Sequence, residues 1–157
     1  MTEFSHLDET GTARMVDVSV KDISVRTATA TGRVVVSPQV VGLLRSGDLP
    51  KGDALGVARV AGIMAAKRTP DLVPLCHPIA LHGVTVDLAV DDDAVAITAT
   101  VRTADRTGVE MEALTAVTVA GLAVIDMVKG VDPAASISDV VVVEKTGGAH
   151  GDWRRPS

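Results

Sequence analysis

The segment 108–130 constrains the fold most, because thirteen consecutive residues inside it, 113–125, carry no charge. Read as a helix, this segment is apolar on every side through its middle, and such a helix belongs in a protein core. Glu110 and Glu112 precede the uncharged run, and Asp126 and Lys129 follow it. The run is too short to cross a bilayer, so the sequence predicts a buried core helix with ionisable residues at both ends.

Asp126 and Lys129 are three positions apart and therefore share a face of the predicted helix. A lysine suits the negative end of a helix dipole, whereas an acid there has no local reason to exist. An acid beside a base is the arrangement that proton transfer requires. An ordinary ion pair at a fraying helix end has the same spacing, and spacing alone favours that interpretation. The residues by themselves do not decide between a proton-transfer pair and an ordinary ion pair.

The composition predicts one domain with a core of small aliphatic side chains. The chain has 157 residues, 46% of them hydrophobic, with no tyrosine and with its two aromatic residues, Phe4 and Trp153, near the ends. That length is typical of a single domain. So much small aliphatic surface on a short chain indicates that part of it is buried between subunits, and we expect a homo-oligomer.

Charge and composition argue against several classes of partner. Lysine and arginine number 15 against 20 acidic residues, a net charge of −5, and no aromatic residue lies between positions 5 and 152. Neither property suits binding to a nucleic-acid backbone or stacking on its bases. The single cysteine, Cys76, excludes an internal disulfide framework. The polar N-terminus lacks a secretory signal, so we expect a cytoplasmic protein without a membrane partner.

Hydrophobic periodicity and turn residues divide the chain into seven elements. Residues 1–14 are expected to form a flexible arm, 15–146 a single domain and 147–157 a glycine-containing tail, with an irregular loop over 69–78. The predicted order β-α-α-β-β-α-β is the ferredoxin-like pattern, an α+β fold with an antiparallel sheet and helices on one face. The strands are predicted at 24–36, 81–90, around 95–101 and at 137–145, and the helices at 38–47, 53–67 and 108–130.

Four lysines stand at the ends of predicted elements. Each alone is typical of a solvated surface, but together they could converge on a polyphosphate. These lysines are Lys51, Lys67, Lys129 and Lys145.

The loop over 69–78 holds one further candidate residue. His77 lies beside Pro78, and a histidine held in this way is suited to phosphate binding or proton transfer, although packing against the loop explains it equally well. Cys76 is interpreted as a small buried side chain. The other histidines share no ligand spacing, so no metal site is predicted.

Six motifs, in order, resemble the MoaC family, the cyclic pyranopterin monophosphate synthases of molybdenum cofactor biosynthesis. They are MVDVS (15–19), KGD (51–53), AAKRT (65–69), LCHP (75–78), GVEMEALTA (108–116) and DMVK (126–129). The resemblance implies a pyrophosphate-releasing lyase that converts 3′,8-cyclo-7,8-dihydro-GTP into cyclic pyranopterin monophosphate. It also implies a ferredoxin-like fold and a hexamer, a trimer of dimers, with active sites between subunits.

The resemblance assigns roles to individual residues. Asp126 becomes the principal acid–base residue, Lys129 its partner and Lys51 a catalytic or phosphate-binding lysine. No resident cofactor is implied, and Mg²⁺ can accompany the triphosphate. The implied substrate contacts are Leu75, Cys76, His77, Met111 and Glu112, with Lys67 and Lys145 as anion contacts.

One position departs from the family pattern. The glycine loop after Lys145 usually carries a second lysine, and Ala149 followed by His150 stands there instead. The departure puts the level of activity in question more than the type of reaction. The alternative reading is a non-catalytic oligomeric module that binds a pterin or nucleotide, which would need the lysines but not Asp126. A purely structural scaffold would bind no nucleotide.

Overall fold

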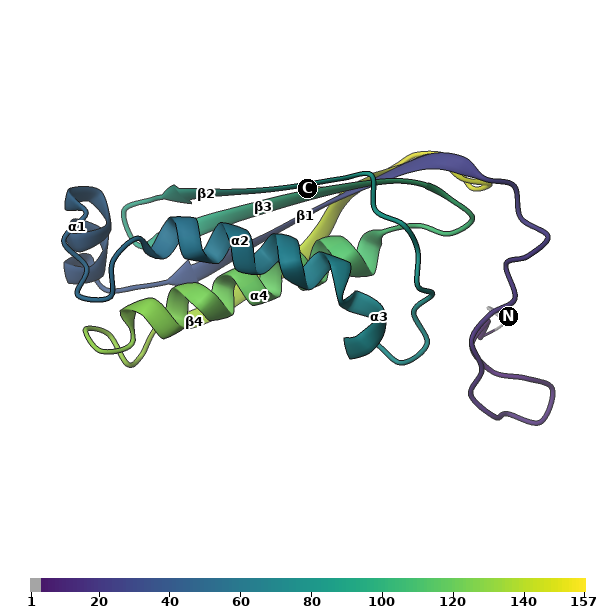
Figure 1. Ribbon diagram of the computed structural model, residues 1–157, viewed down its shortest axis with the longest axis horizontal. Coiled ribbons are helices and arrows are strands. Elements are labelled where there is room, and N and C mark those ends of the chain that lie inside the picture. Colours follow the sequence, from purple (N-terminus) through teal and green to yellow (C-terminus); the bar gives the residue numbers. More distant parts are fainter. Residues whose placement is uncertain (1–3) are drawn as a thin grey trace.

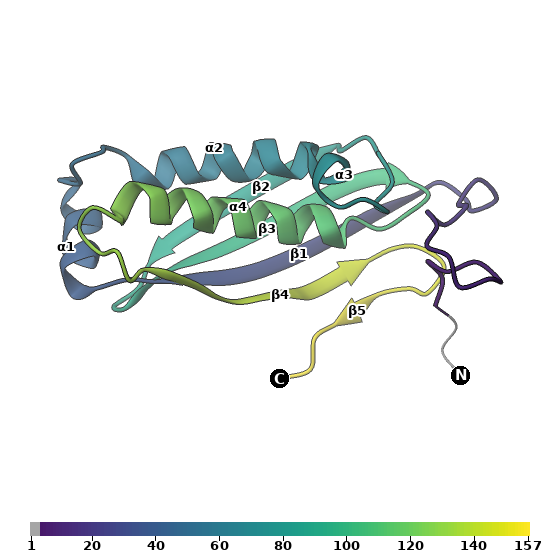
Figure 2. The same ribbon diagram turned by 90° about the horizontal axis from the view of Figure 1, so that it is seen from below.

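The computed structural model describes residues 4–157 as a sheet with two long helices packed on one face (Figures 1 and 2). Two short helices stand outside this pair, α1 near one end of the sheet and α3 directly after α2. In chain order the elements are β1 (Ser24–Val35), α1 (Pro38–Ser46), α2 (Ala54–Lys67), α3 (Thr69–Leu72), β2 (Gly83–Val90), β3 (Ala94–Asp105), α4 (Glu110–Val128), β4 (Ser136–Thr146) and β5 (Trp153–Arg154).

The sheet has the strand order β2-β3-β1-β4-β5, and every neighbouring pair is antiparallel. Its first four strands follow the order expected of a ferredoxin-like sheet, in which the first strand lies between the third and fourth. The helices α2 and α4 cover the same face (Figure 2). The predicted α+β class and arrangement are therefore confirmed.

Local sequence signals explain where the first two helices begin and end. Ser37 caps α1 by accepting a hydrogen bond from the backbone N–H of Val40 at 3.3 Å, and Gly47 ends it in a left-handed conformation with φ of 78°. Asp53 caps α2 by accepting from the N–H of Gly56 at 3.0 Å. Side-chain caps of this kind satisfy N–H groups that the helix itself leaves unpaired.

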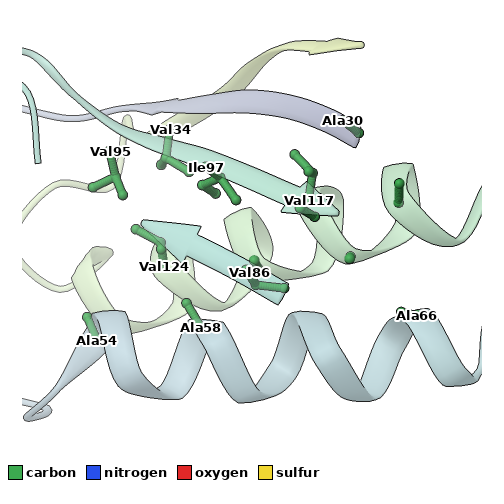
Figure 3. Close-up of a cluster of buried hydrophobic side chains, with 14 of the residues drawn as sticks. Ala30, Val34, Ala54, Ala58, Ala66, Val86, Val95, Ile97, Val117 and Val124 are labelled. Carbon is green, nitrogen blue, oxygen red and sulfur yellow. The ribbon is translucent and has the colours of Figure 1, made fainter. Parts of the chain in front are cut away.

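Small residues bring α4 close to both the sheet and α2. A Cβ atom on Gly32 of β1 would lie 2.6 Å from Val117 Cγ1, and one on Gly62 of α2 would lie 2.9 Å from the carbonyl oxygen of Ala116. The core between these elements consists of valine, alanine and isoleucine (Figure 3). Close packing of small side chains therefore fixes α4 in place, and α4 positions the residues at both of its ends.

The helix α4 is 19 residues long, and by length and composition alone it could cross a membrane. In the fold it packs against α2 and the sheet, and Ala113, Ala116, Val117, Ala120 and Val124 are fully buried there. It is therefore the core helix that the sequence predicts, although it is longer than its uncharged run.

One local expectation is wrong, and one short element was not predicted. Residues 69–72 of the predicted irregular loop form α3, because Pro70 suits the first turn of a helix and the Thr69 hydroxyl donates to the Ala66 carbonyl at 2.9 Å. Part of the predicted tail forms β5, in which Trp153 pairs with Lys145 of β4. The first three residues of the predicted arm lie outside the described residues, and Leu7 and Ala13 of that arm form an isolated antiparallel bridge.

The second face of the sheet carries no helix within residues 4–157 (Figure 1). Threonines occupy much of this face, and the hydroxyls of Thr29 and Thr100 form a hydrogen bond of 2.9 Å across β1 and β3. Val25 and Val35 of β1 are exposed on this face, and Val57, Val60 and Met64 are exposed along one face of α2. The surplus apolar surface thus belongs partly to the helix layer.

Candidate active site

The C-terminal end of α4 holds an acid between two lysines, here called the Asp126 cluster (Lys51, Asp126 and Lys129). Asp126 Oδ1 lies 2.7 Å from Lys129 Nζ and 3.7 Å from Lys51 Nζ. Lys51 also donates to the backbone carbonyl of Asp126 at 3.0 Å. The predicted pairing of Asp126 with Lys129 is present, and the loop between α1 and α2 adds the second lysine.

The two ammonium groups hold the pKa of Asp126 below its ordinary value. The hydrogen bond from Lys129 is the largest cause, followed by the charges of Lys129 and Lys51. Asp126 is therefore ionised at neutral pH and is suited to accept a proton, while each neighbouring ammonium group is suited to donate one. All three side chains are about half exposed, so a substrate can reach them.

The N-terminal end of α4 holds a buried acid beside a thiol, here called the Glu112 cluster (Cys76 and Glu112). Glu112 is only 2% exposed, although it lies in the first turn of the helix. Cys76 Sγ is placed to donate to Glu112 Oε1 at 3.6 Å, and Glu112 Oε2 has no hydrogen-bond partner among residues 4–157. Long-range packing thus joins the loop after α3 to the start of α4.

Burial shifts both groups of this cluster toward their protonated forms. Burial raises the pKa of Cys76 to about 11, and the negative charge of Glu112 adds to the effect. Burial is also the main reason that the pKa of Glu112 is raised. The thiol is therefore protonated and unreactive at neutral pH. Cys76 is half-buried rather than fully buried as predicted.

The remaining residues of the loop and helix start lie near this cluster in the chain. His77 Nε2 contacts the carbonyl oxygen of Val16, which ties the loop to the segment before β1. Leu75 is half-buried, and Met111 is exposed beside Glu112. Met111 therefore offers flexible apolar surface at the protein exterior.

The structure does not bring the four predicted lysines together. Lys51 and Lys129 belong to the Asp126 cluster. Lys145 pairs with Glu110 at 3.4 Å, at the opposite end of α4. Lys67 ends α2, which runs antiparallel to α4, and it makes no ion pair within residues 4–157. The four lysines do not converge within one chain, because α4 separates Lys51 and Lys129 at its C-terminal end from Lys145 at its N-terminal end.

Helix geometry sets the distance between the two clusters. Glu112 and Asp126 are fourteen positions apart on α4, and a rise of about 1.5 Å per residue separates them by about 21 Å. One small substrate cannot contact both acids of the same chain. Each cluster therefore either acts separately or meets the other cluster of a second copy.

A cavity near the Glu112 cluster contains residues that the motifs did not single out. It measures about 200 Å³ and is lined by Lys145 together with Lys21, Arg26, Glu110 and His150. Arg26 alternates in step with Ala28 and Ala30 on the buried face of β1. That periodicity is the one sequence signal that could have identified an arginine inside the fold.

Metal-binding side chains are not grouped in the described part of the chain. No set of three or more histidine, cysteine, aspartate or glutamate side chains within residues 4–157 is placed to hold a metal ion.

These features describe an α+β protein with an exposed acid–lysine cluster at one end of its core helix and a buried carboxyl at the other. The family model described as the MoaC family matches residues 15–148. A cyclic pyranopterin monophosphate synthase of Nocardioides sp. is 68% identical over 155 residues, covering 97% of this chain and 95% of the relative.

Two further relatives carry similar names. A cyclic pyranopterin monophosphate synthase of Streptomyces coelicolor is 68% identical over 96% of this chain and 89% of its own length. A cyclic pyranopterin monophosphate synthase 2 of Mycobacterium tuberculosis is 60% identical over 98% of this chain and 92% of its own length. The chain belongs to the MoaC family.

Proposed function

We propose that this protein is a cyclic pyranopterin monophosphate synthase, a lyase of molybdenum cofactor biosynthesis. It converts 3′,8-cyclo-7,8-dihydro-GTP into cyclic pyranopterin monophosphate and pyrophosphate. Membership of the family and the names of relatives at 68% identity support this activity. The single structural observation that carries it is Asp126 between Lys51 and Lys129, because a module that only binds phosphate has no use for the acid.

Several proton transfers accompany the rearrangement of the purine-derived ring. The ionised carboxylate of Asp126 accepts a proton, and the ammonium group of Lys129 or Lys51 donates one. In the phosphate step, a hydroxyl oxygen of the substrate bonds to the α-phosphorus. The bond to the pyrophosphate oxygen breaks, the hydroxyl proton goes to a base, and pyrophosphate leaves. Nearby lysines stabilise the negative charge that develops.

The Glu112 cluster is suited to recognise the base of the substrate. The oxygen Oε2 of Glu112 has no partner among residues 4–157 and is enclosed, so it can accept a hydrogen bond from a ring N–H once substrate binding exposes it. Met111 and Leu75 offer aliphatic surface for a flat ring in a chain with few aromatic residues. His77 and the main chain of its loop complete the expected contacts.

The separation of the two clusters supports a site shared between subunits. A homo-oligomer that places the Asp126 cluster of one subunit against the Glu112 cluster of another completes one site from two chains. The exposed stripe of Val57, Val60 and Met64 on α2 gives such an assembly apolar surface to bury. We propose a hexamer built as a trimer of dimers.

Three further expectations accompany the activity. The enzyme acts in the cytoplasm, it requires no resident cofactor, and Mg²⁺ reaches the site with the phosphates of the substrate. Dialysis against a chelator followed by an activity assay with and without added Mg²⁺ tests the last two.

The direct test of the activity is release of pyrophosphate from purified protein supplied with 3′,8-cyclo-7,8-dihydro-GTP. The organic product is identified by its mass. We expect stoichiometric formation of pyrophosphate and cyclic pyranopterin monophosphate. Binding of the substrate without turnover by an assembled oligomer would contradict the proposal and favour a non-catalytic binding module.

A further inference from the structure

The chain just before β1 has no regular secondary structure, yet side chains from elsewhere hold it at both ends. This stretch, residues 16–21, is here called the 16–21 segment, and its residues are exposed or half-buried. His77 contacts the backbone of Val16 at one end. At the other end, Arg106 Nε donates to the carbonyl oxygen of Lys21 at 3.1 Å. The segment therefore owes its position to these two side chains, at the end of the molecule where α4 begins (Figure 2).

The contact with Val16 determines which ring nitrogen of His77 carries a proton. A carbonyl oxygen can only accept a hydrogen bond, so Nε2 of His77 is the donor. In a neutral imidazole the other nitrogen, Nδ1, then has no proton and is an acceptor. The side chain is half-buried, and Nδ1 has no hydrogen-bond partner within residues 4–157. The contact thus selects one tautomer and leaves one nitrogen for a ligand.

Asp17 controls the direction of the carbonyl that His77 contacts. The carbonyl of Val16 and the nitrogen of Asp17 belong to one planar peptide unit, so the conformation of Asp17 sets where the carbonyl points. Asp17 Oδ1 accepts a hydrogen bond from the backbone N–H of Ser19 at 2.9 Å. An aspartate that bonds the backbone two residues later forms a local turn and fixes its own backbone. The Asp17 side chain therefore holds the peptide that orients the imidazole.

The charge of Asp17 contributes less than this turn. Hydrogen bonds from Ser19 are the largest cause of the lowered pKa of Asp17, and the charge of His77 adds a smaller effect. Asp17 is exposed, so solvent screens its attraction to the imidazole. A neutral side chain that accepts the same hydrogen bond should therefore replace Asp17 with little loss.

We propose that Asp17 is a positioning residue that, through the Val16 carbonyl, holds His77 in the tautomer protonated on Nε2 and presents Nδ1 to the substrate. The tautomer and its dependence on Asp17 do not depend on which ligand binds. That the ligand is the nucleotide-derived substrate rests on the proposed function. In the complex, Nδ1 accepts a hydrogen bond from a hydroxyl or N–H group of that substrate. A histidine that only fastened the 16–21 segment would have no use for its second nitrogen.

Nitrogen-15 NMR of protein labelled at histidine tests the tautomer without turnover. The chain has four histidines, and comparison with His77→Gln identifies the signals of His77. At about pH 9, where imidazoles are neutral, we expect a protonated Nε2 and an unprotonated Nδ1. A proton found mainly on Nδ1 of His77 would overturn the proposal.

Variants of Asp17 test its positioning role in the same spectra. Asp17→Ala removes the turn and should give a mixture of the two tautomers, whereas Asp17→Asn keeps the accepting oxygen and should retain the wild-type spectrum. Because Asp17 is exposed, both variants should fold. If a melting experiment shows that Asp17→Ala does not fold, Asp17→Ser, which forms the turn more weakly, takes its place. A wild-type tautomer in the variant without the full turn would overturn the role of Asp17.

The matched control is Asp22→Ala. Asp22 is a second exposed acid just beyond the 16–21 segment, and it makes no side-chain hydrogen bond or ion pair within residues 4–157. Its replacement should change neither the tautomer of His77 nor the activity. A tautomer mixture in this control as large as that in Asp17→Ala would also overturn the specific role of Asp17.

Turnover of the triphosphate substrate tests whether Nδ1 is used. The amide nitrogen of a glutamine lies near the place of Nε2 and can keep the contact with Val16, but glutamine has no counterpart of Nδ1. His77→Gln should therefore raise KM by about 3- to 10-fold, the range for loss of one hydrogen bond. An unchanged KM in His77→Gln would show that the contact with Val16 is the whole role of His77 and would overturn the proposal.

A double-mutant cycle separates positioning from a general structural role. Asp17→Ala should raise KM by a similar factor in the wild type. In His77→Asn the side chain is too short to reach Val16, so Asp17→Ala should add nothing there. An Asp17 that merely stabilised the fold would add its full effect in both backgrounds.

These measurements keep the proposal distinct from the proposed function. A tautomer that depends on Asp17, in a protein without synthase activity, would keep the positioning role and reject the synthase. Synthase activity with independent effects of Asp17→Ala and His77→Asn would keep the synthase and reject the positioning role.

Discussion

The two ends of α4 place carboxyl groups in opposite surroundings. Asp126 at the C-terminal end is exposed, lies between two ammonium groups and has a lowered pKa. Glu112 at the N-terminal end is buried beside a thiol and has a raised pKa. The same chemical group is thus ionised at one end and shifted toward its neutral form at the other.

In the proposed function, this contrast lets one rigid element serve two different tasks. Proton transfer needs an accessible, charged base with partners that return the proton, and Asp126 meets those conditions. Selective recognition needs a desolvated polar group with a free hydrogen-bonding atom, and Glu112 Oε2 is one. Because the close packing around Gly32 and Gly62 fixes α4, both environments are built into the fold before any ligand binds.

The largest expected effect is on catalysis at the exposed end. Asp126→Asn should lower kcat by about 10²- to 10⁴-fold, the range for loss of a general acid–base group. Its melting temperature should stay close to that of the wild type, because the side chain is on the surface. Steady-state release of pyrophosphate and a thermal melt measure the two quantities.

The matched control for that variant is Asp92→Asn. Asp92 is an exposed acid that pairs with Arg45 at 3.2 Å, far from either cluster in the chain. It should retain full activity. If Asp126→Asn retained the wild-type kcat, Asp126 would not be catalytic, and the two ends of α4 would not differ in the way described.

The second prediction concerns the thiol at the buried end. A pKa of about 11 for Cys76, against the ordinary 9.0, lowers its thiolate fraction at pH 8 by about 100-fold. Alkylation by iodoacetamide should therefore be slow and should increase with pH without levelling off below pH 10. Glu112→Gln removes a neighbouring negative charge and should speed the reaction. A rate that levels off near pH 9 in the wild type would show that the surroundings of Cys76 are not as described.

The smallest expected effect is on how stability depends on pH. A raised pKa means that folded Glu112 binds more protons than unfolded Glu112 once pH exceeds its ordinary value of 4.5. Its stabilising contribution is therefore complete below that pH and is lost as pH rises through the folded pKa. Asp126, with its lowered pKa, has the opposite sign and loses its contribution as pH falls.

Thermal melts of Glu112→Gln and the wild type between pH 4 and pH 8 test the sign. The variant should gain stability relative to the wild type as pH increases from 4.5. If the wild type instead became more stable relative to Glu112→Gln as pH increases, Glu112 would have to be ionised and well paired in the core.

Sequence periodicity was sufficient to predict the fold because the apolar pattern and the helix-capping residues indicate the same elements. Ser37 and Gly47 mark the ends of α1 as predicted, Asp53 caps the helix it was predicted to begin, and the alternation in β1 matches its buried face. The pairing of Trp153 with Lys145 escaped prediction, since a two-residue strand has no periodicity to detect.

The site was predictable only in part, for a geometric reason. The spacing of Asp126 and Lys129 along one helix places them together, and the structure confirms that pairing. The contact between Cys76 and Glu112 joins residues 36 positions apart, and only the tertiary fold brings them together. The separation of Lys51 and Lys129 from Lys67 and Lys145 likewise follows from the antiparallel packing of α2 on α4. No sequence motif predicts that packing.

Mixing two variants that we expect to be inactive tests the central claim, that each site combines the Asp126 cluster of one subunit with the Glu112 cluster of another. Asp126→Asn and Glu112→Ala are each purified alone and also produced together, so that mixed oligomers form. Random assembly leaves about a quarter of shared sites with both clusters intact, so the mixed sample should recover about a quarter of wild-type activity. Activity no higher than that of either variant alone would show that the two clusters do not meet across subunits.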